Sequence, residues 1–137
     1  MDTHSVHEHE ARIRALDADW LAAAERRDLE GMLAIYAADA QELLPDLPPI
    51  VGSAAIRVFY ADLFRQFPRL AFHFAQEEVL VAHSGDLAIA RGTYRFTPDA
   101  NQPERVDSGK FVGVWRWIDG DWRLVLNISN GTASSPD

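Results

Sequence analysis

Residues 111–128 have the sequence FVGVWRWIDGDWRLVLNI, and this stretch decides the fold class. Two apolar and aromatic runs, 111–118 and 122–128, flank the pair Asp119-Gly120. An Asp-Gly pair between such runs is a strong β-hairpin signal, because both residues readily take the positive φ angles that a tight turn requires. The stretch therefore predicts two antiparallel strands near the end of the chain.

A second pair of strands precedes this hairpin. Residues 72–82 and 87–97 flank the turn Ser84-Gly85-Asp86, and the polar segment 99–104 leads on to the hairpin. Apolar runs bounded by glycine, aspartate and serine are typical of strands joined by tight turns. The second half of the chain therefore predicts consecutive hairpins.

The first half has the period of helices instead. Apolar residues recur at helical spacing over 11–27, over a short stretch after Asp28 that reaches Tyr36, and over 53–67. Asp28 and Ser53 are suited to cap the second and third helices, and Pro68 ends the third. Helices followed by hairpins predict an α+β fold, with three N-terminal helices packed on a curved antiparallel sheet.

Length and composition are those of one globular domain. A chain of 137 residues can bury a core without staples, and the absence of cysteine excludes disulfides and cysteine-bound metals. We expect a single domain over residues 11–130, with flexible tails at 1–10 and 131–137. His4, His7 and His9 fall in the first tail, where no fold fixes their geometry, so we predict no metal site.

The net charge of −8, with 13 scattered basic residues, excludes several partners. A nucleic-acid binder needs a basic stripe, and an acidic surface is also repelled by anionic membranes. No apolar run approaches the roughly 20 residues that span a bilayer, and residues 1–10 do not resemble a secretory signal. We expect a cytoplasmic protein that binds neither nucleic acid nor membranes.

The order of these elements and several local strings resemble the nuclear transport factor two–like superfamily. It includes ketosteroid isomerase, scytalone dehydratase, SnoaL-like polyketide cyclases and many proteins of unknown function, to which the chain is most similar. Three stretches carry the resemblance: 20–39 with Trp20, Asp28, Tyr36 and Asp39-Ala40; GSAAIR at 52–57 with Phe59-Tyr60; and SGKF at 108–111, VWR at 114–116, GDWRL at 120–124 and NISN at 127–130.

The resemblance covers about residues 10–130 and implies a cystatin-like cone with an internal cavity for a small apolar molecule. Large apolar walls and a few polar groups are typical of such cavities. The candidate ligand-binding residues are Trp20, Tyr36, Phe59, Tyr60, Leu63, Arg91, Trp115 and Asn127. For the aromatic and aliphatic residues the alternative is plain core packing, and for Arg91 it is a solvated or interfacial position.

The comparison with ketosteroid isomerase tests the chemistry. That reaction uses a carboxylate base and an oxyanion hole made by a tyrosine and a protonated aspartic acid. The resemblance places these positions at Leu44, Trp20 and Gly113, so all three groups are missing, although the indole N–H of Trp20 can still donate a hydrogen bond. Steroid isomerisation is therefore not expected.

Three carboxylates lie near the expected mouth of the cavity. Asp46 and Asp39 are the candidate catalytic bases, although Asp39 also suits a structural role at a helix-to-strand turn. Glu42 is the third carboxylate in this region.

The last strand predicts a dimer. Strict alternation places Arg123, Val125, Asn127 and Ser129 on one face and an apolar row, Trp122, Leu124, Leu126 and Ile128, on the other. An apolar row on the outer face would be covered in an isologous homodimer, which is common in the superfamily.

The resemblance implies a small-molecule-binding SnoaL-like protein, an isomerase, cyclase or dehydratase that acts without a cofactor on an apolar, polyketide-like or steroid-like compound. The alternative is a non-catalytic ligand-binding or assembly module of the same fold. The two differ in whether a base points into the cavity.

Overall fold

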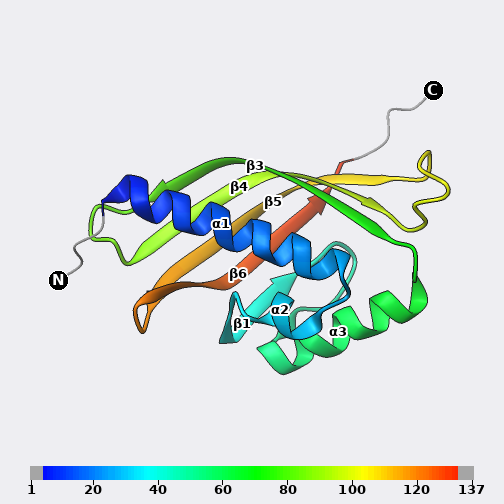
Figure 1. Ribbon diagram of the computed structural model, residues 1–137, viewed down its shortest axis with the longest axis horizontal. Helices are drawn as coiled ribbons and strands as arrows, with labels where there is room; N and C mark the ends of the chain where they lie inside the picture. The colour runs from blue at the N-terminus through cyan, green and yellow to red at the C-terminus, as the bar shows by residue number, and fades with distance from the viewer. Residues whose placement is uncertain (1–4, 133–137) are drawn as a thin grey trace.

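Three helices cover the concave side of a curved six-stranded sheet (Figure 1). The computed structural model describes residues 5–132. The elements in chain order are α1 (Val6–Glu25), α2 (Leu29–Leu33), β1 (Tyr36–Leu43), β2 (Ile50–Val51), α3 (Ser53–Gln66), β3 (Ala71–Val81), β4 (Leu87–Thr97), β5 (Asp107–Ile118) and β6 (Asp121–Gly131).

The strands lie in the order β2-β1-β6-β5-β4-β3. All neighbours are antiparallel except β1 and β6, which are parallel. The predicted α+β fold is confirmed, but the sequence analysis missed β1 and β2 and their parallel and antiparallel pairings. Tyr36 accordingly opens β1 and does not belong to the apolar face of α2.

The N-terminal boundary also differs from the prediction. Helix α1 begins at Val6, because Ser5 and Glu8 form a capping box in which each side chain bonds the other's backbone N–H. The flexible tails predicted at 1–10 and 131–137 are therefore wrong for residues 6–10 and for Gly131, which ends β6, while residues 1–4 and 133–137 lie outside the described residues. At α3 the cap is Gly52, with φ of 92°, and Ser53 is the first helical residue.

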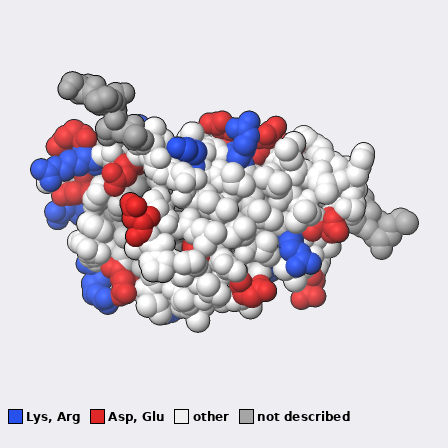
Figure 2. Space-filling model, turned by 180° about the vertical axis from the view of Figure 1, so that it is seen from behind, with Lys and Arg blue, Asp and Glu red and all other residues white. Residues whose placement is uncertain are grey.

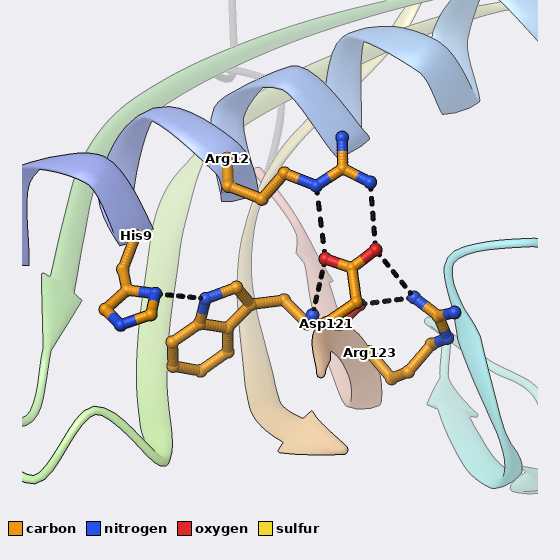
Figure 3. A network of polar contacts seen from close by, with 5 residues as sticks. His9, Arg12, Asp121 and Arg123 are labelled. Carbon is orange, nitrogen blue, oxygen red and sulfur yellow. Dashed lines mark hydrogen bonds and ion pairs between the residues drawn. The ribbon is translucent and has the colours of Figure 1, made fainter. Parts of the chain in front are cut away.

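Two polar contacts fasten the start of α1 to the β5–β6 hairpin (Figure 3). His9 is 2% exposed, and its Nδ1 accepts a hydrogen bond of 2.9 Å from the indole N–H of Trp122. Arg12 binds both carboxylate oxygens of Asp121, at 3.1 and 2.9 Å, and lowers the pKa of Asp121 to about 2. These contacts keep α1 across the sheet.

A bulge divides β6 into two halves. The side chains that face inward have even residue numbers before the bulge and odd residue numbers after it. Trp115 pairs with Leu124 but Val114 pairs with Leu126, so Val125 is the extra residue. Before it, Trp122 and Leu124 face inward and are 0% and 7% exposed. A bulge shifts the alternation by one residue, so Asn127 also faces inward. The predicted outer row is therefore wrong for Trp122 and Leu124.

A second bulge lies in β3, where Gln76 pairs with Gly92 but Glu78 pairs with Arg91, leaving Glu77 extra. The backbones approach so closely here that a Cβ atom on Gly92 would lie 1.9 Å from the carbonyl oxygen of Ala75. Only glycine fits at this position without a backbone shift.

We predict that Gly92→Ala lowers the free energy of unfolding by about 1–3 kcal/mol, the usual effect of forcing extra atoms into a packed site. Gly131→Ala is the matched control, because a Cβ there meets nothing within 4 Å. Urea titration of both variants measures the effect. A Gly92→Ala protein as stable as Gly131→Ala would contradict this account of the bulge.

Candidate functional site

A cavity of about 340 Å³ lies between α1 and the inner face of the sheet. Its walls come from α1, α3 and four strands, with aromatic side chains in the middle and polar groups toward both sides. The lining residues are Arg14, Asp17, Ala18, Trp20, Leu21, Ile35, Tyr36, Glu42, Tyr60, Phe74, Gln76, Phe111, Leu124 and Asn127.

A buried carboxyl, Glu42, lies at the β1–β6 side of this cavity and is 1% exposed. The hydroxyl of Tyr36 donates to its Oε1 at 2.6 Å, and the amide of Asn127 donates to its Oε2 at 2.9 Å. Glu42 and Asn127 are direct neighbours across the parallel β1–β6 pair, which sets this contact. The hydroxyls of Tyr36 and Tyr60 are also hydrogen-bonded to each other.

Burial dominates the electrostatics of this group. Loss of water raises the pKa of the Glu42 carboxyl, while the hydrogen bonds from Tyr36 and Asn127 oppose that rise. Burial and the nearby Glu42 charge also raise the pKa of Tyr36 and of Tyr60, so both phenols stay protonated. A raised carboxyl pKa moves toward neutral pH, where a group can both take and give a proton.

Aromatic rings form the middle of the cavity wall. The Trp20 ring packs edge-on against Tyr60 at 5.7 Å and against Phe74 at 5.4 Å between ring centroids. Phe74 continues to Phe111 on β5 at 5.9 Å. Such rings present flat apolar surface and make the cavity suitable for a planar organic molecule.

A second polar cluster lies at the α1–β3 side. Gln76 donates its amide N–H to Asp17, and Arg14 donates to the backbone oxygen of Gln76 at 3.0 Å. Burial raises the pKa of Asp17 to about 7, although the nearby positive charge of Arg14 works in the opposite direction.

Among the residues predicted from sequence, Trp20, Tyr36, Tyr60 and Asn127 line the cavity. The structure places the other four elsewhere. Trp115 is 1% exposed in the core, and Phe59 and Leu63 pack against that core from α3. Arg91 is exposed and pairs with Glu77 and Glu78 on β3.

Neither candidate base reaches the cavity lining. Asp39 lies exposed on β1, and Asp46 is exposed in the following turn with φ of 62°. Glu42 takes their place as the carboxyl in the cavity, two residues before Leu44, the position that the isomerase comparison gave to the base. Leu44 and Gly113 do not line the cavity, whereas Trp20 does.

Two signals in the sequence could have singled out Glu42, which was named but not selected as a candidate base, and Asp17, which was missed. Side chains two apart on a strand share a face, so recognising β1 would have placed Glu42 beside the position of Leu44. Asp17 is four residues after Ile13 and three before Trp20, which puts a carboxylate on the buried stripe of α1. The bulge in β3 turns the Gln76 side chain toward α1, and Gly92 was the one residue in the sequence that could have indicated this bulge.

Residues 5–132 contain no group of three or more side chains placed to hold a metal ion. Within the same range, no helix combines the length and the apolar character needed to cross a membrane.

The helices, the curved sheet and a cavity with a mixed polar and aromatic lining define an α+β cone. The model of the SnoaL-like domain matches residues 18–125. The chain therefore belongs to the SnoaL-like domain family. No curated protein matches it.

Solved structures agree on the fold. An NTF2-like protein of unknown function from Pseudomonas putida KT2440 is 22% identical, with a TM-score of 0.83 over 95% of this chain and 90% of that one. A ketosteroid isomerase-like protein from Erwinia carotovora atroseptica SCRI1043 is 21% identical, with a TM-score of 0.73 over 90% and 96%. A domain of unknown function with a cystatin-like fold from Nostoc punctiforme PCC 73102 is 16% identical, with a TM-score of 0.82 over 95% and 81%.

We predict that Glu42→Gln gains stability relative to the wild type as the pH rises. Below the unfolded-state pKa of about 4.3, Glu42 is protonated in both states. Above it the unfolded chain releases the proton while the folded chain retains it, because the folded pKa is raised. Folding of the wild type is then disfavoured by up to about 1.4 kcal/mol per pH unit until the folded pKa is reached.

Urea titrations of both proteins from pH 4 to 8 measure this difference. Both proteins keep Asp17, so subtracting one curve from the other isolates Glu42. A constant difference over the whole range would contradict the raised pKa.

Proposed function

We propose that the chain binds a small, largely apolar carbonyl compound in the cavity and that Glu42 moves a proton on it. The observation that carries the proposal is the Glu42 carboxyl, which is buried from solvent yet lines the cavity. A buried carboxyl with a raised pKa in a concave site is a characteristic of general acid–base catalysis. The reaction class is isomerisation or a related proton-transfer step.

The chemistry follows from the groups around Glu42. A base that takes a proton from the carbon beside a carbonyl leaves the electron pair on the carbonyl oxygen, and return of the proton to another carbon completes an isomerisation. The indole N–H of Trp20 has no hydrogen-bond partner within residues 5–132 and lines the same cavity. It is suited to hydrogen-bond the oxygen that gains charge.

Exchange of the α hydrogens of 2-tetralone, an apolar bicyclic ketone, tests the proton transfer in D2O by NMR. The wild type is expected to accelerate the exchange above the buffer rate. Glu42→Gln is expected to reduce that acceleration about 10²–10⁴-fold, the usual effect of removing a positioned base. Asp39→Asn is the matched control, because Asp39 is an exposed carboxylate on the same strand.

Equal exchange by the wild type and by Glu42→Gln would contradict the role of Glu42. Binding of 4-phenylphenol is measured separately from the fluorescence of that probe. If the wild type binds the probe but exchanges the ketone hydrogens only at the buffer rate, catalysis is rejected and the non-catalytic binding module is favoured.

We also propose that the chain forms a homodimer through the outer face of the sheet. Four apolar side chains lie next to one another in register across that face: Leu80, Ile89, Val114 and Leu126. Leu80 and Ile89 are 57% and 42% exposed. Figure 2 shows this side of the molecule, where charged side chains lie mostly around the margin. An exposed apolar patch with a charged margin is typical of an interface.

Light scattering coupled to size exclusion at micromolar concentration is expected to give the mass of a dimer. Ile89→Lys is expected to give a monomer, because it places a charge in the centre of the apolar patch. Val58→Lys is the control, since Val58 is 61% exposed on α3, away from the sheet face. A wild-type mass of one chain would refute the dimer.

A further inference from the structure

The α1–β3 side of the cavity is built around the bulge in β3. The extra residue Glu77 resets the alternation, and Gly92 allows the close approach of the two backbones. Gln76 consequently faces α1, where its amide donates to Asp17. Arg14 donates to the backbone oxygen of Gln76, so α1 and the bulge are held together.

This arrangement leaves one polar group unused. Within residues 5–132, the buried side-chain atoms without a hydrogen-bond partner are Oε1 of Gln76 and Nε1 of Trp20, and both residues line the cavity. A buried polar group without a partner costs about 1–3 kcal/mol. Turning the Gln76 amide would only exchange the unpaired oxygen for an unpaired N–H. One polar group of Gln76 is thus available to a molecule in the cavity.

Asp17 complements this free group. Its carboxyl is half-buried beside Gln76, and the loss of water there raises its pKa to about 7. The carboxyl therefore both donates and accepts hydrogen bonds near neutral pH. A ligand hydroxyl also does both, so it can donate to the oxygen of Gln76 and bond to Asp17 at the same time.

The position of this pair relative to Glu42 limits the shape of the ligand. Glu42 is on β1 and Gln76 is on β3, with β6, β5 and β4 between them. At about 4.8 Å per step, the two strands lie roughly 19 Å apart along the sheet. Side chains shorten this span from both sides, and the rings of Trp20, Phe74 and Phe111 line it.

We infer that Asp17 and Gln76 form a second binding subsite, so that the cavity takes an elongated apolar molecule with an oxygen-bearing group at each end. One end bonds at Glu42 and the other, a hydroxyl, bonds at Asp17 and Gln76. This inference rests on the proposed function, because it assumes that the cavity is the binding site.

Two rigid probes that differ by one hydroxyl test the subsite. We would measure the dissociation constants of 4-phenylphenol and 4,4′-biphenol for the full chain by fluorescence titration. The wild type is expected to bind the biphenol about tenfold more tightly, the equivalent of one hydrogen bond of about 1.4 kcal/mol. Because 4,4′-biphenol has two equivalent hydroxyls, it can bind in two equivalent orientations, which by itself would tighten its apparent dissociation constant only about twofold.

Two variants remove the subsite in different ways. Gln76→Met keeps the length of the side chain. Asp17→Leu combined with Gln76→Met leaves neither side chain of the pair with an unpaired polar group, so it is expected to fold. In each, the preference for the biphenol should fall to about twofold, while the affinity for 4-phenylphenol stays within twofold of the wild type. Asp19→Asn, an exposed carboxylate on the same helix, should keep the full preference.

The outcomes separate the two proposals. A wild type that binds 4-phenylphenol but does not prefer the biphenol would overturn the subsite and leave the proposed function intact. A preference that persists in both variants would also overturn it. A wild type that binds neither probe would overturn the proposed function, and the subsite with it.

Discussion

The arrangement of the site depends on one extra residue, Val125, in β6. A strand without a bulge would place Trp122, Leu124 and Leu126 on one face and turn Asn127 away from the cavity. With the bulge, Trp122 and Leu124 still pack under α1, and Asn127 reaches Glu42 at 2.9 Å. The same shift moves Leu126 to the outer face of the sheet. A single irregularity therefore sets the core, the buried carboxyl and the apolar outer patch.

The burial of Glu42 is tolerated because its two oxygens have good donors. An unpaired buried carboxylate is strongly destabilising, and hydrogen bonds from Tyr36 and Asn127 offset only part of that effect, since the pKa of Glu42 is still raised. An apolar side chain at this position would leave the Tyr36 hydroxyl and the Asn127 amide without their acceptor, which is itself destabilising. Glu42, Tyr36 and Asn127 therefore form one buried polar network, in which each group depends on the others for its hydrogen bonds.

The sequence predicted the fold well where periodicity is strong. The hairpin around Asp119-Gly120 was found, and β4 has the predicted bounds of Leu87–Thr97. Strand β1 was missed because Tyr36–Leu43 is rich in alanine and has no regular alternation. The bulge in β6 could not be seen, because an unbroken apolar alternation over 122–128 reads the same with or without an extra residue. Of the cavity lining, the sequence thus predicted the aromatic residues Trp20, Tyr36 and Tyr60 and the amide of Asn127.

Two amide side chains line the cavity, and each faces inward because of a bulge: Asn127 because of the bulge in β6, and Gln76 because of the bulge in β3. A bulge changes which side chains face inward without changing the order or direction of the strands. Proteins can therefore share this cone and differ in the polar groups that line it. The structural relatives superpose over most of the chain at only 16–22% identity. Such a likeness carries the fold but not the chemistry, which must be argued from Glu42, Asp17 and the two amides of this chain.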